Sequence, residues 1–389
     1  MGLTASLDIG NEKIVMALAA VEHGACRLVG IKIIASQGME RGMVKDSEKV
    51  RACVRSLISE LVKDREVEIM NVALPGEALQ MSERRISVPL QKRVVESGDL
   101  FRADQRCREG AGSRQEELVD IIPVAFSVDR GELIADPIGK TGRTLEVTYQ
   151  VYMANSDYLA EFRELLEDCG VGEICFYPMA RAYSEALEIT VTDRDFALLD
   201  MGAMGINVVL FREGMLEYEA RLPLGMRTID SDIMVAFGIT WGQARKLKHE
   251  YGQALRSVCK NKKLQIPDTK LTLESRDLAM VVQSRMEELL EGAVYLLQSW
   301  GFDRAEDEIL LTGGGSRLQD VDILLHRLSG HPVVKAGIKQ IQTSREEVLR
   351  TPEYTVALGL LLCEQLEIEE SRGGIGEKLA KGLKGFFGI

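Results

Sequence analysis

Two stretches far apart in the sequence repeat one pattern, an apolar strand followed by Asp-x-Gly and then by a second apolar strand. The first is LDIGNEKIVMAL at residues 7–18, and the second is LLDMGAMGINVVLF at residues 198–211. Apolar runs joined by a short turn predict β-hairpins. One Asp-x-Gly turn is common in structural hairpins, but a repeat half a chain apart indicates two related halves. We therefore expect two halves that each open with a hairpin whose turn carries an aspartate.

A glycine-rich turn follows a third apolar strand. Residues 308–328 read EILLTGGGSRLQDVDILLHRL, in which three glycines separate a buried strand from an amphipathic helix. The glycines allow a close backbone approach to a ligand, and Ser316 is expected to cap the helix. Free N–H groups at such a helix start suit an anion or a sugar edge. The spacing fits neither the P-loop nor the dinucleotide-binding glycine pattern.

The remaining segments alternate between strand and helix patterns. Residues 47–63 predict a capped amphipathic helix, and residues 118–153 alternate as strands do. Residues 275–300 and 353–366 predict two further helices. The alternation indicates an α/β architecture.

Composition excludes several classes of protein. The formal net charge of -12 disfavours a general nucleic-acid surface, so no nucleic-acid partner is expected. The seven cysteines form no C-x-x-C pair, and the four histidines show no metal-ligand spacing. No run approaches 18 apolar residues, and no signal peptide opens the chain. These features favour free thiols in a reducing compartment, without a transition-metal site or a membrane span.

The last residues, GGIGEKLAKGLKGFFGI at 373–389, reverse the charge of the rest of the chain. On a helical wheel, one face is apolar and the opposite face carries lysines. Such a helix, following a flexible acidic linker, suits an anionic lipid surface better than a protein core. The apolar face comprises Ile375, Leu379, Leu383, Phe386, Phe387 and Ile389, and the basic face comprises Lys378, Lys381 and Lys384.

These motifs together carry a family resemblance. The two hairpins, the glycine-rich turn and TPEYTVALGLLL at 351–362 resemble the two phosphate loops, adenosine loop and closing helix of the actin/Hsp70/sugar-kinase superfamily. Within it, the chain resembles the FtsA family of bacterial cell-division proteins, because residues 119–155 are similar to the subdomain inserted in that family. Residues 222–252 are similar to the segment that enters the family's upper second domain.

The resemblance implies an actin-like two-domain α/β fold with an inserted small α+β subdomain and a C-terminal amphipathic helix. The implied parts are subdomain 1A at 1–84 and 163–195, the inserted subdomain 1C at 85–162, subdomain 2A at 196–227 and 301–350, subdomain 2B at 228–300, the closing helix of 1A at 351–366, a linker at 367–374 and a membrane-targeting helix at 375–389.

The resemblance also implies ATP and Mg²⁺ as cofactors. Asp8 and Asp200 would hold Mg²⁺ through water, and Lys248 lies where the family usually contacts the ribose or base. Glu185 is the candidate for positioning an attacking water. The remaining expected nucleotide contacts are Gly10, Asn11, Lys13, Gly202, Gly205, Gly313, Gly314, Gly315 and Ser316.

The implied function is an ATP-binding protein that polymerises on the membrane and tethers FtsZ at the division site. Arg276 and Arg285 match the neighbourhood of the family surface that captures the FtsZ C-terminal peptide, although a solvated helix face would carry the same residues. Further partners would be the chain itself, the anionic lipid surface and other division proteins that bind the inserted subdomain. The expected location is peripheral, on the cytoplasmic face of the cell membrane.

The second phosphate loop departs from the family pattern. The family has D-I-G-G-G-T followed two residues later by aspartate, whereas residues 200–207 read DMGAMGIN. Ala203 and Met204 disfavour positive φ angles, and Asn207 supplies no anion. We therefore expect at most a slow ATPase. The alternatives are a PilM-like actin-fold assembly factor and a small-metabolite kinase of the same superfamily.

Overall fold

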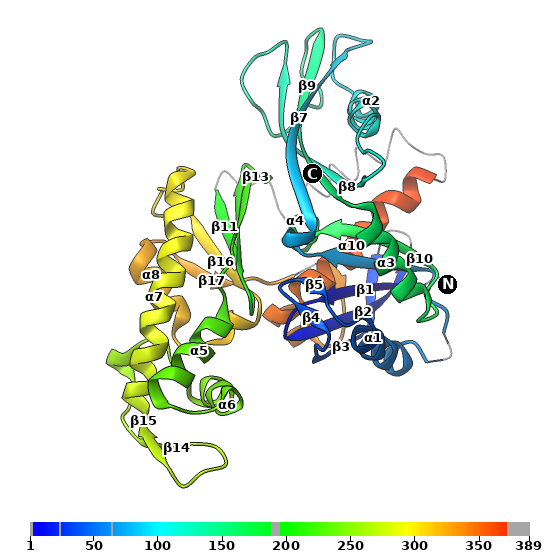
Figure 1. Cartoon of the computed structure of the whole chain (residues 1–389). Coiled ribbons are helices and arrows are strands. Elements are labelled where there is room, and N and C mark those ends of the chain that lie inside the picture. The colour runs from blue at the N-terminus through cyan, green and yellow to red at the C-terminus, as the bar shows by residue number, and fades with distance from the viewer. Residues whose placement is uncertain (1–2, 23–24, 64, 188–194, 339, 372–389) are drawn as a thin grey trace. The chain divides into compact units, whose positions relative to one another are not determined.

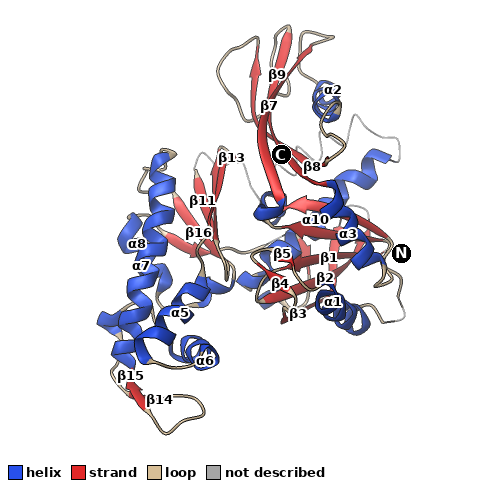
Figure 2. Cartoon of the chain, in the orientation of Figure 1, coloured by secondary structure: helices blue, strands red, loops and turns tan. Residues whose placement is uncertain are grey.

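A computed structural model describes residues 3–22, 25–63, 65–187, 195–338 and 340–371. The chain forms two compact units (Figure 1). Unit 1 comprises Met1–Asp193, Phe211–Glu217 and Gly337–Ile389, and unit 2 comprises Arg194–Leu210 and Tyr218–Ala336. The expected mixed α/β class is confirmed, with strands and helices in both units (Figure 2).

Unit 1 is built on a six-stranded sheet with the strand order β10-β6-β1-β2-β3-β18. The sequence of β2 is continuously apolar because alternate residues are buried on opposite faces of the sheet. Ile14, Met16 and Leu18 join the core under α1 and α3, whereas Val15 and Ala17 pack with α10. The strands are β1 (Leu3–Ile9), β2 (Lys13–Glu22), β3 (Ala25–Ala35), β6 (Ile69–Leu74), β10 (Glu173–Pro178) and β18 (Ile341–Gln342).

Helices and short elements complete this unit. The capped helix predicted at 47–63 is confirmed as α1 (Ser47–Leu61), with Asp46 as its N-cap. The others are a hairpin of β4 (Met39–Glu40) and β5 (Met43–Val44), and the helices α1 (Ser47–Leu61), α3 (Ser156–Glu167), α4 (Met179–Ala186), α9 (Glu346–Leu349) and α10 (Thr355–Ser371), with the 3-10 turns η1 (Gly76–Ala78) and η4 (Pro352–Tyr354).

The inserted subdomain lies between β6 and α3 in the chain and has its own core. Its sheet has the order β7-β9-β8, with β7 (Leu79–Pro89), β8 (Glu116–Val128) and β9 (Thr144–Asn155), and α2 (Ser97–Arg108) packs on it. Its sheet begins at Leu79 and ends at Asn155, and the expected subdomain limits of 85 and 162 stay a prediction. β7 is one unbroken strand, and α3 buries Leu159 and Phe162 in the core of the larger sheet.

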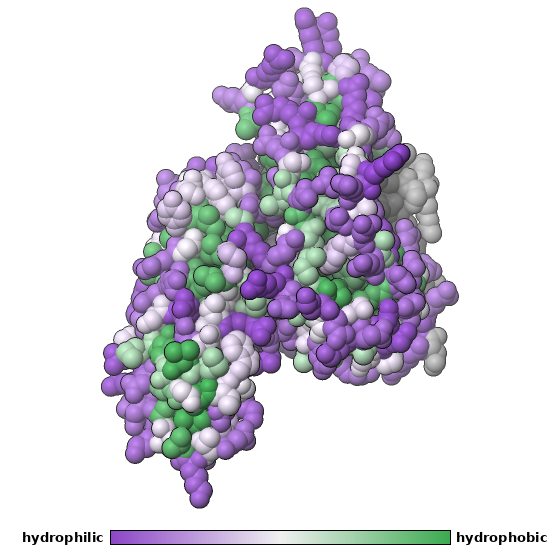
Figure 3. Space-filling model, in the orientation of Figure 1, coloured by the Kyte–Doolittle hydropathy of each residue, from purple (hydrophilic) through white to green (hydrophobic). Residues whose placement is uncertain are grey.

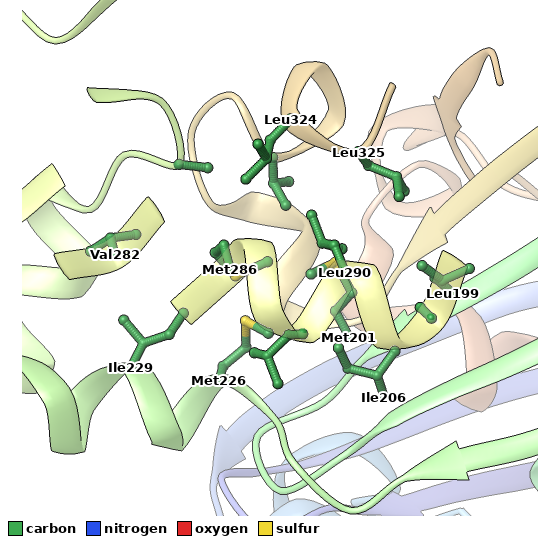
Figure 4. Close-up of a cluster of buried hydrophobic side chains, with 14 of the residues drawn as sticks. Leu199, Met201, Ile206, Met226, Ile229, Val282, Met286, Leu290, Leu324 and Leu325 are labelled. Carbon is green, nitrogen blue, oxygen red and sulfur yellow. The ribbon is translucent and has the colours of Figure 1, made fainter. Parts of the chain in front are cut away.

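Unit 2 contains most of a five-stranded sheet with the order β13-β12-β11-β16-β17, of which only the segment Phe211–Glu217, around the β12–β13 turn, is grouped with unit 1. One face of β11 and β12 packs against α5 and α7, with Met201 and Ile206 meeting Met226 and Met286 (Figure 4). The strands are β11 (Phe196–Met201), β12 (Ile206–Arg212), β13 (Met215–Leu222), β16 (Glu308–Thr312) and β17 (Val333–Lys335).

The helices of unit 2 include the long helix that the sequence predicts at 275–300. They are α5 (Met226–Phe237), α6 (Trp241–Tyr251), α7 (Ser275–Ser299) and α8 (Val321–Ser329), with the 3-10 turns η2 (Arg256–Val258) and η3 (Gly314–Arg317) and a hairpin of β14 (Lys263–Gln265) and β15 (Thr272–Glu274).

The C-terminal region corrects one expectation. α10 continues to Ser371, so residues 367–371, expected in a flexible linker, are helical. The helix predicted at 375–389, with all of its expected membrane-binding residues, lies outside the described residues. Within the described ranges, every helix is too short or too polar to cross a bilayer.

Candidate functional site

The first Asp-x-Gly turn, in unit 1, is tightly fixed. Asp8 is 6% exposed and lies in β1 between Val15 of β2 and Ala73 of β6. The turn closes through a hydrogen bond from the Gly10 N–H to the Lys13 carbonyl oxygen at 2.9 Å. This part of the predicted site is therefore a rigid hairpin with a buried carboxylate.

Two other residues expected to bind the nucleotide hold this turn in place. Asn11 Oδ1 accepts a hydrogen bond from the Gly42 N–H at 3.1 Å, and Lys13 Nζ donates to the Glu353 carbonyl oxygen at 3.2 Å. The turn is thus tied to the β4–β5 hairpin and to η4, the 3-10 turn that precedes α10. A ligand-binding role for either side chain stays a prediction.

The second Asp-x-Gly turn, in unit 2, is bonded to the first turn of α5. The Gly202 N–H donates to the Gly205 carbonyl oxygen at 2.9 Å, while the Met226 and Arg227 N–H groups donate to the carbonyl oxygens of Gly202 and Ala203 at 3.0 and 2.9 Å. A Cβ atom at Gly225 would lie 2.5 Å from the Gly205 nitrogen, so only glycine fits there. The sequence reasoning missed Gly225, whose signal is a glycine directly before a helix.

The altered loop sequence fits this turn without strain. None of residues 202–205 adopts a positive φ angle, although all four are described. The expectation that Ala203 and Met204 would be disfavoured by a need for positive φ is therefore wrong. The side chains of Ala203 and Met204 change the surface that the loop offers to a ligand, whereas the φ angles of the loop are ones that any residue can adopt.

The glycine-rich turn lies beside the second loop, because β16 pairs with β11 and aligns Thr312 with Asp200. Gly313 has φ 76°, and a Cβ atom there would lie 2.1 Å from Asp200 Oδ1. At Gly315 a Cβ atom would meet Met201 and Met226 at 2.7 Å, whereas at Gly314 it would meet nothing within 4 Å. Internal packing thus accounts for two of the three glycines, and Gly314 is the one open to a ligand.

The expected cap at Ser316 is wrong. Its hydroxyl is buried and donates to the Gly313 carbonyl oxygen at 2.7 Å, and α8 begins only at Val321. The serine therefore stabilises the 3-10 turn itself. A role in binding the adenosine stays a prediction.

Lys248 reaches the same end of unit 2 from α6. Its Nζ donates to the Met226 carbonyl oxygen at 2.9 Å and to Asp230 Oδ2 at 2.8 Å, and Asp230 is 2% exposed. Lys248 thus fixes α6 to the first turn of α5, next to the glycine-rich turn. Unit 2 brings together the second loop, Lys248 and the glycines, while Asp8 and its turn belong to unit 1.

Family comparisons identify this arrangement. The profile described as "Cell division protein FtsA" matches residues 197–359, and the profile described as "SHS2 domain inserted in FTSA" matches residues 76–153. Together they cover more than half of the chain. The chain belongs to the FtsA family.

Curated relatives agree over most of the length of FtsA. The chain is 24% identical over 379 residues to the Cell division protein FtsA of Escherichia coli strain K12, with 92% of this chain and 89% of the relative covered. It is 23% identical over 385 residues to that of Bacillus subtilis strain 168, with 96% and 86% covered.

Solved structures confirm the actin-like fold. A PilM-PilN type IV pilus biogenesis complex matches with a TM-score of 0.68 and 20% identity, covering 92% of this chain and 98% of the matched chain. MreB5 of Spiroplasma citri bound to ADP matches with a TM-score of 0.57 and 11% identity, covering 96% and 99%.

In this FtsA-family chain, Glu185 lies in a mostly buried charged cluster where the inserted subdomain meets α4. Arg181 on α4 binds Asp120 of β8 through Nε–Oδ2 at 2.8 Å and Nη2–Oδ1 at 3.1 Å, and its Nη1 lies 3.7 Å from Glu185 Oε1. Burial raises the pKa of Glu185 to about 7, against the opposing effect of Arg181. A role for Glu185 in positioning water stays a prediction.

The two arginines expected at the FtsZ surface differ in their surroundings. Arg276 lines a groove of about 610 Å³ between η2 and the start of α7, together with Arg256, Ser257, Met280, Gln283, Ser284 and Glu287. Arg285 instead binds Asp232 of α5 at 2.5 and 3.0 Å and also pairs with Glu288. Arg276 Nε also donates to the Cys259 carbonyl oxygen at 3.1 Å, and Arg285 joins α7 to α5. A partner-binding role for either arginine stays a prediction.

Proposed function

We propose that this chain binds ATP, self-associates on the cytoplasmic face of the membrane and tethers FtsZ there during cell division. The observation that carries the proposal is the FtsA-specific inserted subdomain, found in one chain with both Asp-x-Gly hairpins. Similarity to FtsA over nine-tenths of the chain supports the same conclusion.

Nucleotide binding is supported by the hairpin turns and the glycine-rich turn. The Gly10 turn and the loop at 202–205 would contact phosphates, and Gly314 and Lys248 would contact the adenosine. MreB5 structures that share the fold hold ADP or AMPPNP. ATP would favour filament formation, with hydrolysis at most slow.

Membrane attachment is assigned to residues 375–389. Each apolar side chain of that helix contributes at most roughly 1.5–3 kcal/mol on full burial, and helix formation opposes part of this. One tail should therefore bind weakly. A filament that presents several tails together would bind far more tightly.

Co-sedimentation with lipid vesicles tests the proposed membrane attachment and its dependence on ATP. The intact chain and a chain ending at Ser371, where α10 ends, would be sedimented with anionic-lipid vesicles with and without Mg-ATP. We expect the intact chain to pellet, ATP to increase the bound fraction severalfold, and the shortened chain to remain soluble. An F386E/F387E variant controls for loss of the apolar face alone. An intact chain that stays in the supernatant would favour a PilM-like assembly factor or a kinase.

The groove beside α7 is the proposed site for the FtsZ C-terminal peptide. Arg256 and Arg276 carry positive charge there, and Met280, which is 44% exposed, adds an apolar side chain. Apolar side chains also gather on the lobe that contains α5 and α6 (Figure 3). A groove of this character suits a peptide with acidic and apolar side chains.

Peptide affinity should separate the two arginines. We expect R276Q to weaken binding of the FtsZ peptide about tenfold, because one charge-assisted hydrogen bond is lost. R285Q should leave the affinity within about twofold and instead lower the thermal midpoint, because Arg285 is bound to Asp232. Fluorescence anisotropy with labelled peptide gives both affinities. Equal losses in the two variants would place the peptide elsewhere.

A further inference from the structure

Residues 256–276 form a basic segment in an otherwise acidic chain. Six basic residues there stand against only Asp268 and Glu274, which leaves the segment a net charge of +4, whereas the whole chain carries -12. Asp268 is already paired with Lys246 of α6 at 3.5 Å, and Glu274 lies across the β14–β15 hairpin from Lys263. Among the residues that the structure describes, no carboxylate forms an ion pair with any of the six. They are Arg256, Lys260, Lys262, Lys263, Lys270 and Arg276.

Part of this segment is fixed to the first turn of α7. The Lys262 N–H donates to Ser275 Oγ at 2.9 Å, and that hydroxyl donates to the Lys260 carbonyl oxygen at 3.0 Å. Arg276 Nε donates to the Cys259 carbonyl oxygen at 3.1 Å. Ser275 is 4% exposed, whereas both lysines are exposed. The two lysine side chains therefore extend from a backbone that is held at the end of the groove where Arg276 lies.

The opposite end of the groove is acidic. The α7 residues that line the groove recur at helical spacing from Arg276 to Glu287, so they share one face of the helix over about 16 Å. Met280, an exposed apolar residue, lies between these two. Glu287 Oε1 accepts a hydrogen bond from Gln283 Nε2 at 2.7 Å, and Gln283 Oε1 accepts one from the Arg256 N–H at 2.6 Å. The groove thus has a basic end at the start of α7, an apolar centre and a carboxylate at its far end.

This distribution of charge suits a segment whose acidic residues lie at one end. The unpaired lysines attract an acidic residue that leaves the groove beside Arg276, while Glu287 repels one at the other end. Asp277 follows Arg276 in the sequence but does not line the groove. A continuous polyanion, such as a bilayer surface or a nucleic acid, would place negative charge against Glu287 as well. A peptide with acidic residues at one end would not.

We propose that Lys260 and Lys262 form a docking surface for the acidic flank of a peptide bound in the groove, and that Glu287 fixes the direction in which the peptide lies. The partner is a protein segment with apolar side chains at its centre and acidic residues at one end. The inference rests on the peptide site proposed above, to which it adds the direction of binding and a surface outside the groove.

The test uses the full chain and a labelled FtsZ C-terminal peptide, extended at its N- or C-terminal end by a short run of glutamates or, as a reference, of serines. We expect the glutamates to tighten binding about threefold to tenfold at one end only, because exposed ion pairs contribute modestly. At the other end they should weaken binding. Raising NaCl from about 0.05 M to about 0.5 M should reduce the gain to less than about twofold. Fluorescence anisotropy measures each dissociation constant.

Variants that remove charge locate the gain. K260Q/K262Q should abolish it while leaving the affinity for the serine-extended peptides within about twofold. E287Q should remove the penalty at the other end, a result that a purely structural role of Glu287 would not produce. R327Q/K335Q, the matched control, removes two exposed basic side chains of α8 and β17 outside the groove and should retain the full gain. Thermal midpoints of the variants identify any loss that comes from unfolding.

Each outcome separates this inference from the proposed function. Absence of binding by the serine-extended peptides would overturn the peptide site itself. Binding of those peptides without a gain from glutamates, or with equal gains at both ends, would overturn the docking surface and leave the peptide site in place. So would a gain that persists in K260Q/K262Q or that disappears in R327Q/K335Q. A glutamate run that binds as tightly without the FtsZ sequence would also overturn it, because the surface would then accept any polyanion.

Discussion

Gly359→Ala should destabilise unit 1 by about 3 kcal/mol or more. Gly359 lies in α10 where that helix crosses α4, and a Cβ atom there would be 2.0 Å from the Ala182 carbonyl oxygen and 3.0 Å from the Ala186 Cβ. Because the first obstacle is backbone, no side-chain rotation can relieve the clash, and the helices must separate. The separation would loosen two bonds that fix α10 to the sheet, from Ser6 to the Ala357 carbonyl oxygen and from Asn71 to that of Leu360.

A second helical glycine provides the matched control. Gly98 in α2 has nothing within 4 Å of its ideal Cβ position, so Gly98→Ala should be neutral or stabilise by up to about 1 kcal/mol through helix propensity. Thermal midpoints should fall by at least about 6 °C for Gly359→Ala and should not fall for Gly98→Ala. Hydrogen exchange should rise in α4 and α10 of the first variant only. Equal midpoints for the two variants would refute the close helix crossing.

The hairpins, the long helices and the fold class could be predicted because they depend on local periodicity. β1 and β2 lie where the apolar runs around DIGNEKI predict them, and α7 coincides with the predicted helix at 275–300 within a residue or two. The spacing of apolar residues and the residue types of turns depend on only a few neighbouring positions, so both can be recognised in the sequence. The family resemblance added the order of the parts.

The errors concern features that depend on tertiary contacts. Ser316 precedes a helix as a cap would, but its hydroxyl donates to the Gly313 carbonyl oxygen. Gly313 has a positive φ angle and packs against Asp200 of the neighbouring strand β11. Likewise, no local signal indicates that Leu159 of α3 is buried in the core of the larger sheet. Such choices are decided by residues far away in the chain.

The reasons for the glycines also depend on distant residues. A run of three glycines suggests close approach to a ligand, yet Gly313 and Gly315 are required by Asp200, Met201 and Met226. Likewise, Arg221 has no local signal, because its contact with Asn207 joins residues 14 apart on neighbouring strands. A motif search finds the residues that resemble a family. It does not find a residue outside the motif, such as Arg221, that contacts an altered motif residue such as Asn207.

Stability should depend on pH through Glu185, and Glu185→Gln should remove this dependence. Burial raises the pKa of this carboxyl from its ordinary value of 4.5 to about 7 in the folded chain. The folded state therefore holds a proton that the unfolded state releases between these values. Stability is full below pH 4.5 and falls as the pH rises through 7, by about 3 kcal/mol at 1.36 kcal/mol per pKa unit.

Because a glutamine at this position is always neutral, the variant should be more stable than the unchanged chain by about 3 kcal/mol at pH 8.5, by about 1.4 kcal/mol at pH 5.5, and nearly equal to it below about pH 4. Urea unfolding of unit 1 across this range measures the difference. Glu161→Gln on the exposed face of α3 makes the same chemical change and should shift the curve by less than about 0.5 kcal/mol at every pH. Parallel stability curves for Glu185→Gln and the unchanged chain would show that the carboxyl ionises normally beside Arg181. A steeper loss with rising pH in the variant would mean that the ionised Glu185 stabilises the contact between α4 and the inserted subdomain.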